Sequence, residues 1–346
     1  MEATQTLLIN QGQIKQLINM HDVNQAVHET FVGFGRRDVK NPTKVTLDLG
    51  QNDDWPDYDG FANAMPAYIG GEDDVAGLKW VLGIGGERKA AGLPYINGMI
   101  LLADPAMGEF KAIMDGAFIT NLRTGAQAAN TLAYFAGKRE EISFGLYGTG
   151  TQARTTVMAI ADLYQIKHID LWNHRDKSAE SFIRDMQKYV KGDINFVGVD
   201  HPEKAANNEY VITATSSADP ILQAEWFEAG QKIIPLGSGQ EVSNRLILKA
   251  DDIVVDHPGQ AFHRGSLANL YAAGRIDRGD ITTTIGAIAS GRYRLQKEDV
   301  ESSLVLAIPI GTGAMDIAVA EKVYQKAKAD SNTPKFAFQD QNSIDE

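Results

Sequence analysis

A glycine-rich turn in the middle of the chain contains the residues with the clearest chemistry. Gly148, Gly150 and Ala153 match the pattern GxGxxA, directly after the apolar run 142–147 and directly before an amphipathic helical pattern. Backbone N–H groups at such a turn, together with the positive end of the following helix, bind the pyrophosphate of a dinucleotide. Because a strand and a helix flank the glycines and further strands follow, the prediction of a dinucleotide site is more specific than the glycine pattern alone would allow. Cofactor contacts are expected from Gly148, Thr149, Gly150, Thr151 and Gln152.

The end of the second strand of this unit should decide between NAD and NADP. An NAD site usually has an acidic residue there, which accepts hydrogen bonds from the ribose hydroxyls. Here the strand HIDLWN ends at Asn173 and is followed by His174 and Arg175. Because Arg175 can pair with a 2′-phosphate, the sequence favours NADP(H) and leaves NAD(H) as the second choice. Asn173, His174 and Arg175 are therefore expected to contact the cofactor.

Two polar segments could complete the site. Thr215, Ser216 and Ser217 follow a later strand, at the edge where open parallel sheets bind ligands, and either meet the nicotinamide ribose or form a hydroxyl-rich turn. Arg123 and Thr124 precede a run of small residues at the expected start of a helix. An arginine there can hold a carboxylate through two parallel hydrogen bonds, or it can simply be exposed.

Two kinds of secondary structure must position these residues. From 44 to 102, strand-like segments separated by Gly, Asp and Pro predict a mostly antiparallel sheet, in which Lys79 can face either solvent or the interior. After residue 138, strands alternate with helices. The strand candidates are 142–147, 168–173, 194–199, 209–215, 232–237 and 252–256. This rhythm predicts an α/β fold with a Rossmann-type, doubly wound parallel sheet, beside a second α+β domain.

Composition narrows the function classes. The 346 residues are 43% hydrophobic and 23% charged, as in ordinary globular domains, and no apolar run approaches the roughly 20 residues that span a bilayer. The chain has no cysteine, which excludes thiolate metal sites and cysteine nucleophiles and fits a cytoplasmic location. A net charge of -12 opposes binding to nucleic acid. We therefore expect a small-molecule ligand, no metal and no membrane partner.

Several segments occur together in an order and spacing that resemble the ornithine cyclodeaminase/mu-crystallin family, over about residues 5–328. The most specific is RTGA at Arg123, followed about two dozen residues later by GTGTQA at Gly148. The others are MPAYIG at Met65, GLKW at Lys79, TATSS at Thr215 and GAMDIAVAEKVYQKA around Asp316.

The resemblance implies a homodimer of two-domain subunits. Residues 1–130 and 305–346 would form a substrate-binding and dimerisation domain, and 131–304 the Rossmann domain, with the apolar run from residue 304 returning the chain to the first domain. The resemblance also implies that Arg123 and Lys79 bind the α-carboxylate of a small amino or imino acid, with Lys79 close to the reacting carbon. We assign Lys44, Met65 and Asp316 to the same substrate site, and Thr124 to the cofactor.

Three segments depart from the family pattern. Family members commonly have an arginine after a proline where this chain has 41–44, and Lys44 cannot make a planar two-pronged clamp. Cyclodeaminases have Gly-Ala-Asp where this chain has 237–239, so a glycine takes the place of the aspartate; Glu241, nearby, is our candidate for the missing catalytic carboxylate. Residues 263–266 replace a frequent Gly-Glu pair.

These observations favour an NAD(P)H-dependent oxidoreductase acting on a C–N bond: an imine or cyclic ketimine reductase, or an amino acid dehydrogenase. The first alternative is an ornithine cyclodeaminase, which converts L-ornithine to L-proline and ammonia and whose proton transfers use the carboxylate that this loop lacks. The second is a crystallin-like protein that binds NADPH and a ligand without turnover. Two cations at one cleft, Lys79 and Arg123, argue against it.

Overall fold

The chain folds into two compact units. The computed structural model describes residues 5–50, 55–174, 176–296 and 301–338. The first unit comprises the described parts of Met1–Ala26, Arg37–Thr120 and Thr312–Glu346, and the second comprises those of Val27–Arg36 and Asn121–Gly311. Two helices, α2 (Met20–Arg36) and α4 (Ala117–Ala136), contribute residues to both units.

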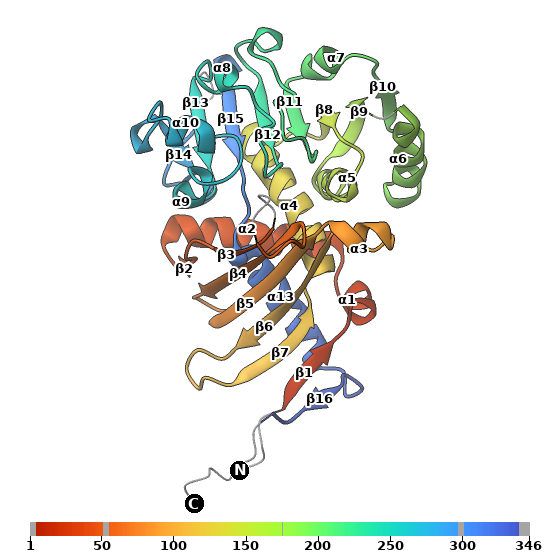
Figure 1. Ribbon diagram of the computed structural model, residues 1–346, viewed down its shortest axis with the longest axis vertical. Coiled ribbons are helices and arrows are strands. Elements are labelled where there is room, and N and C mark those ends of the chain that lie inside the picture. Colours follow the sequence, from red (N-terminus) through yellow and green to blue (C-terminus); the bar gives the residue numbers. More distant parts are fainter. Residues whose placement is uncertain (1–4, 51–54, 175, 297–300, 339–346) are drawn as a thin grey trace, which may run out of the picture. The chain divides into compact units, whose positions relative to one another are not determined.

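The first unit contains an eight-stranded sheet with the order β16-β1-β7-β6-β5-β4-β2, in which β3 also pairs with β4 (Figure 1). All these pairs are antiparallel except β1 with β7. The strands are β1 (Thr6–Ile9), β2 (Val39–Lys40), β3 (Val45–Leu49), β4 (Gly60–Ile69), β5 (Val75–Ile84), β6 (Ile96–Ala103), β7 (Phe110–Asp115) and β16 (Lys335–Phe336). The short helices are α1 (Gln11–Leu17), which a capping box between Asn10 and Gln13 begins, and α3 (Gly86–Ala90).

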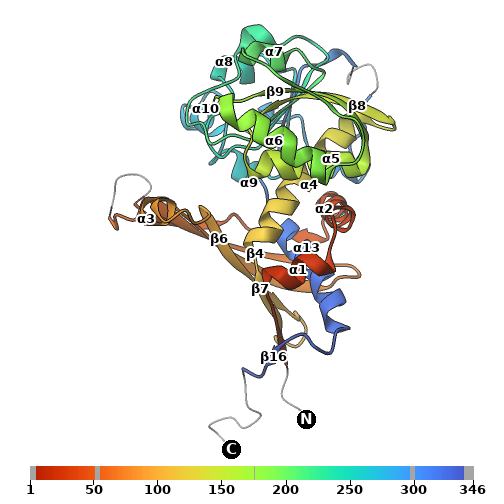
Figure 2. The same ribbon diagram turned by 90° about the vertical axis from the view of Figure 1, so that its right-hand side faces the viewer.

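One long helix covers one face of this sheet. Helix α13 (Gly313–Lys328) packs on β4, β5 and β6, and its first nine residues are all buried (Figure 2). Strand residues alternate accordingly, so that Met65, Lys79 and Ile100 lie buried on the same face while their neighbours Trp80 and Met99 are exposed on the other.

The second unit contains an eight-stranded sheet in which every pair is parallel, with the order β10-β9-β8-β11-β12-β15-β13-β14. The doubly wound parallel sheet is confirmed. Its strands are β8 (Glu141–Tyr147), β9 (Gln165–Trp172), β10 (Asn195–Gly198), β11 (Tyr210–Thr213), β12 (Lys232–Pro235), β13 (Asp252–Val255), β14 (Thr283–Thr284) and β15 (Val305–Ile308). Continuous apolar runs such as β8 are typical of strands that are covered on both faces.

Helices and short 3-10 turns connect these strands. They are α5 (Thr151–Leu163), α6 (Asp176–Tyr189), α7 (Pro202–Ala206), η1 (Ala224–Trp226), α8 (Asn244–Ile247), α9 (Pro258–Ala261), α10 (Ala268–Ala272), η2 (Arg278–Asp280) and α11 (Ile285–Ala289).

Two expectations from the sequence were wrong. The apolar run after residue 304 does not return the chain to the first unit, because β15 pairs with β12 and β13 inside the parallel sheet. The helix containing Arg123 begins at Ala117, so Arg123 lies in its second turn and the positive end of the helix does not act on a ligand there. Sequence periodicity predicted neither the partners of β15 nor the first residue of α4, because a short buried strand and the first turn of a helix have too few residues to show a periodic pattern.

A glycine brings α4 against α5 inside the second unit. A β-carbon on Gly125 would lie 2.3 Å from the carbonyl oxygen of Thr155 and 2.7 Å from the backbone nitrogen of Thr156. The two helices therefore touch through their backbones at this point. The contact fixes the backbone of α4, which carries Arg123 two residues before Gly125, relative to the helix that follows the glycine turn.

We expect Gly125→Ala to destabilise the protein, although alanine is normally the better residue inside a helix by about 1 kcal/mol. The added methyl group must push two backbones apart, at a cost of about 1–3 kcal/mol. Thermal unfolding followed by circular dichroism measures the change. Gly198→Ala is the control, because a β-carbon there has no heavy atom within 4 Å. Equal melting temperatures for the two variants would contradict the close contact.

Candidate functional site

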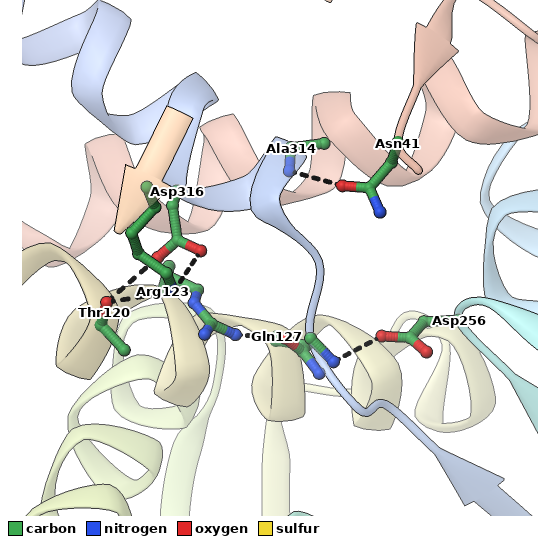
Figure 3. Close-up of polar contacts among 9 residues, drawn as sticks. Asn41, Thr120, Arg123, Gln127, Asp256, Ala314 and Asp316 are labelled. Atoms are coloured by element: carbon green, nitrogen blue, oxygen red, sulfur yellow. Dashed lines mark hydrogen bonds and ion pairs between the residues drawn. The ribbon is translucent and has the colours of Figure 1, made fainter. Parts of the chain in front are cut away.

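Lys79 forms a buried polar cluster with Thr120 and Asp316 in the first unit. Its Nζ donates to Oδ2 of Asp316 at 2.6 Å and to Oγ1 of Thr120 at 3.3 Å. The Thr120 hydroxyl in turn donates to Oδ1 of Asp316 at 3.2 Å, as drawn in Figure 3. Lys79 is 1% exposed and Asp316 is fully buried. The structure thus resolves the choice left open by the sequence: the lysine faces inward.

The energetics of this cluster follow from its burial. Removing an ammonium and a carboxylate from water costs several kcal/mol each, and only close pairing with good hydrogen bonds offsets that cost. Lys79 and Asp316 have this pairing, with Thr120 as an additional partner of both. The cluster is therefore balanced in charge and fixed in geometry, which suits an ammonium that must point at one atom.

Two further residues that the sequence assigned to the substrate site, Met65 and Lys44, lie in the first unit. Met65 on β4 is the register partner of Lys79 on β5, so the two side chains leave the same face of the sheet. Lys44 is half-buried and lies between β2 and β3. Asn41, in the segment that departs from the family pattern, accepts a hydrogen bond from the backbone N–H of Ala314 at 3.0 Å (Figure 3). Asn41 thereby holds the first turn of α13.

Arg123 is buried in the second unit and is oriented by Gln127, one turn along α4. Its NH1 donates to Oε1 of Gln127 at 3.1 Å (Figure 3), and Nε2 of Gln127 donates to the carbonyl of Pro309 at 2.5 Å. Gly311 lies directly against the guanidinium, since a β-carbon there would come within 2.3 Å of NH1.

Asp256, at the end of β13, holds the backbone beside Arg123. Its Oδ2 accepts from the N–H of Gly311 at 2.7 Å, and its Oδ1 accepts from the N–H of His257 at 2.7 Å. Burial raises the pKa of Asp256 above its usual value, while these backbone bonds and one from Ile310 act in the opposite direction. The carboxyl group fixes the loop that closes over the guanidinium.

The glycine turn has the geometry of a phosphate site. Gly148 has φ of 102°, a conformation that favours glycine, and a β-carbon on it would lie 2.5 Å from the carbonyl oxygen of Ala214. Gly150 is the N-cap of α5, and a β-carbon there would meet no heavy atom within 4 Å, so the space in front of the helix start is open. Gln152 donates to Oδ1 of Asn121 at 3.2 Å.

The expected cofactor-selecting residues lie at the end of β9. Thr149 donates to Ser178 at 3.0 Å, and Asn173 donates to the same hydroxyl, so Ser178 ties the glycine turn to the strand end. His174 is exposed. Arg175, on which the NADP prediction depends, lies outside the described residues.

Thr215 and Glu241 form a buried network at the ends of β11 and β12. Oε1 of Glu241 accepts from the N–H and the hydroxyl of Thr215 at 2.9 and 2.6 Å, and Oε2 accepts from Thr213 and from the N–H of Gly237 at 2.6 and 2.7 Å. Glu241 is 0% exposed. Both oxygens are fully engaged, so the geometry favours a structural role over the catalytic one suggested by the sequence. Ser217 donates to the carbonyl of Asp219, and Ser216 is exposed beside it.

Three functional neighbours were missed in the sequence. Gln127 could have been found, because it follows Arg123 at i+4 on an expected helix. Asp256 ends a recognised strand, at the edge where ligands bind. Thr120 carried no signal, because its partners come from residues 41 before it and 196 after it.

The described part of the chain contains no group of three or more His, Asp or Glu side chains arranged to hold a metal ion. Within the same residues, no helix is both long and apolar enough to cross a membrane.

We expect Asp316→Ala to destabilise the protein by about 3–5 kcal/mol, because it leaves the buried Lys79 ammonium without its carboxylate. Replacing both residues together, as Lys79→Met with Asp316→Leu, should cost less. Urea unfolding of the variants measures both. The matched control is Glu141→Ala, which breaks the exposed pair with Lys167 and should cost less than about 1 kcal/mol. If Asp316→Ala lowered the free energy of unfolding no more than the control does, the buried ion pair would not stabilise the first unit as we infer.

Comparison with known proteins agrees with the fold and the motifs. The model of the ornithine cyclodeaminase/mu-crystallin family matches residues 4–331. The alanine dehydrogenase of Archaeoglobus fulgidus is 31% identical over 337 residues, which cover 96% of this chain and 99% of that protein.

Two solved structures are similar over nearly the whole chain. An archaeal alanine dehydrogenase dimer with bound NAD has a TM-score of 0.85 at 30% identity and covers 97% of this chain and 100% of its own. The Δ1-pyrroline-2-carboxylate reductase of Thermococcus litoralis, in complex with NADH and L-proline, has a TM-score of 0.82 at 25% identity, with 93% and 98% covered. With a family model matched from residue 4 to residue 331, the chain belongs to the ornithine cyclodeaminase/mu-crystallin family.

Proposed function

We propose that this protein is an NAD(P)H-dependent oxidoreductase that acts on the C–N bond of a small amino or imino acid. The observation that carries the proposal is the glycine turn at the start of α5, because Gly148 has φ of 102° and the space in front of Gly150 is open, as the binding of a dinucleotide phosphate requires. Similarity to an alanine dehydrogenase and to a pyrroline-carboxylate reductase gives the same reaction class.

The glycine turn is suited to the dinucleotide. The open space in front of Gly150, the backbone N–H groups at the start of α5 and the hydroxyl of Thr151 would receive the pyrophosphate. Thr124, Thr149 and Gln152 lie on the same turn or on α4, and the segment 215–217 follows the neighbouring strand β11. When bound, the nicotinamide supplies or accepts the hydride at the carbon of the C–N bond.

The substrate groups act by holding and by proton transfer. We assign the α-carboxylate to Arg123, whose planar guanidinium binds it through two parallel hydrogen bonds, and to Lys79. Asp316 and Thr120 fix the Lys79 ammonium, which orients it towards one substrate atom. In the reductive direction the substrate nitrogen gains a proton as its carbon gains hydride, and we assign that proton to Lys79. Met65 and Lys44 are proposed to border the substrate.

The choice of cofactor is a separate part of the proposal. Asn173 and His174 put polar residues in place of an acidic one at the end of β9, and with Arg175 next in the sequence they favour NADP(H). The similar structures were solved with NAD and NADH, which favours NAD(H). An assay with both cofactors separates the two.

We further propose that the protein is a homodimer, and that the exposed face of the first unit's sheet forms the interface between the two subunits. A cross-strand row on that face joins Val45, Ala64, Trp80 and Met99 by register. Val45, Trp80 and Met99 are 68%, 52% and 54% exposed. An apolar sheet face of this kind is typical of an interface, and a similar archaeal structure is a dimer. We propose that the first unit serves substrate binding and dimerisation, and that the second unit, which also carries Arg123, binds the dinucleotide.

The purified protein should oxidise NADPH or NADH when given Δ1-pyrroline-2-carboxylate, Δ1-piperideine-2-carboxylate, or pyruvate with ammonia or methylamine. Absorbance at the nicotinamide band follows the reaction. L-ornithine with catalytic NAD is tested separately. Proline and ammonia formed from ornithine, without net cofactor consumption, would identify a cyclodeaminase. Cofactor binding without turnover on any substrate would identify a crystallin-like binder.

Arg123→Lys should raise KM for the imine or keto acid by about tenfold or more, because lysine cannot make the two-pronged contact. Lys79→Met should lower kcat by about a hundredfold or more, the usual size for loss of a proton-transfer group. Cofactor affinity, measured by calorimetry, should stay unchanged in both variants. Weakened cofactor binding would show that these residues were assigned to the wrong ligand.

Trp80→Glu should convert the dimer into monomers, because the charge would have to be buried at the interface. Size-exclusion chromatography with light scattering measures the mass. Tyr189→Glu, on α6, makes the same kind of change at another exposed aromatic residue and should remain dimeric. A dimeric Trp80→Glu variant, or a monomeric wild type, would rule out this interface.

A further inference from the structure

Glu241 is a buried carboxylate whose four hydrogen bonds all come from neutral donors. The donors are the hydroxyls of Thr213 and Thr215 and the backbone N–H groups of Thr215 and Gly237. Burying a carboxylate is costly, so these short bonds of 2.6 to 2.9 Å must be what makes the position tolerable. A group held in this way is suited to holding chain segments together.

The four donors join the carboxyl ends of two adjacent parallel strands. Thr213 is the last residue of β11 and Thr215 starts the segment that follows, whereas Gly237 lies two residues after β12. Glu241 itself lies before α8. The carboxylate therefore connects the turn after β11 to the turn after β12, at the edge of the sheet where ligands of such folds bind. We call these four hydrogen bonds of Glu241 the clasp.

The clasp also reaches the glycine turn after β8. Strand β8 is the neighbour of β11, and Gly148 packs directly on the residues that Glu241 holds. A β-carbon on Gly148 would lie 2.5 Å from the carbonyl oxygen of Ala214 and 3.3 Å from Cγ2 of Thr215. Movement of the segment 214–215 would therefore displace the turn that is to hold the pyrophosphate.

We propose that Glu241 is a positioning residue for the dinucleotide: its carboxylate sets the segment after β11 against the glycine turn, and it neither touches the substrate nor exchanges a proton with it. The proposal rests on the proposed function, because it presumes a dinucleotide at the turn. It replaces the catalytic role that the sequence suggested for this residue.

The negative charge is needed for the clasp, and a neutral isostere cannot substitute for it. Each oxygen accepts from one backbone N–H, that of Thr215 or that of Gly237. In Glu241→Gln, whichever way the amide is turned, its NH2 group faces one of these N–H donors. One donor then loses its partner and meets a second donor, so the clasp opens on one side.

The decisive experiment measures cofactor affinity and substrate kinetics of Glu241→Gln. We expect the Kd for NADH and for NADPH, by isothermal titration calorimetry, to rise about tenfold or more, the size expected for loss of one charge-assisted hydrogen bond. The KM for the imine substrate and kcat at saturating cofactor should change less than about threefold. The matched control is Glu225→Gln, the same substitution at an exposed ion pair with Arg245 in the same unit, which should bind both cofactors like the wild type.

Thr213 supplies a second test that does not depend on how well Glu241→Gln folds. Thr213→Val removes the hydroxyl that donates to Oε2 and should weaken cofactor binding, while Thr213→Ser keeps the donor and should weaken it much less. Unchanged cofactor affinity in Glu241→Gln, or equal affinities for the two Thr213 variants, would overturn the proposal. A fall in kcat with unchanged cofactor affinity would instead restore the catalytic role. If the wild type bound neither NADH nor NADPH, the proposed function itself would fail.

Discussion

A lysine ammonium can be buried only if an opposite charge is buried with it, and this constraint organises the first unit. Lys79 is carried by the central strand β5, and the carboxylate it needs comes from Asp316, more than two hundred residues later. Helix α13 must therefore lie on that face of the sheet, at the height that brings its fourth residue to Lys79. The small first-turn residues Gly313 and Ala314 permit that approach, since a β-carbon on Gly313 would come within 2.6 Å of the Met65 carbonyl.

The second unit handles buried carboxylates by another route. Within the described residues, the hydrogen bonds to Asp256 and Glu241 come from backbone N–H groups and hydroxyls, and none comes from a lysine or an arginine. Hydrogen bonds from neutral donors keep a local negative charge in place and fix the donors in return. As a result, two loops at one edge of the parallel sheet are each fixed by a side chain from another loop: the segment after β11 by Glu241 and the backbone at Gly311 by Asp256. Precision of this kind is what a hydride transfer between two bound molecules requires.

The sequence was sufficient for whatever depends on local pattern. The parallel sheet, the glycine turn at Gly148 and the family motifs could all be predicted, because each depends on a pattern of consecutive residues. The sequence was insufficient wherever a side chain finds a partner far along the chain. No spacing rule connects Lys79 to Asp316, or Glu241 to Thr213, and strand β15 is too short for its neighbours to be inferred. Whether an acid is catalytic or structural depends on what surrounds it, and only the fold shows that.

The carboxylates also limit the chemistry. Cyclisation with loss of ammonia needs a base that can take up and return protons at two nitrogens in turn. Three buried carboxylates of the described residues are already engaged: Asp316 is paired with Lys79, Asp256 holds the loop at Gly311, and Glu241 holds Thr215 and Gly237. Each is committed to a contact whose loss would disturb the site itself. A single reduction at carbon with one proton delivered to nitrogen makes no such demand, because the Lys79 ammonium can supply that proton while Asp316 keeps its position. The arrangement therefore suits an imine reductase or amino acid dehydrogenase better than a cyclodeaminase.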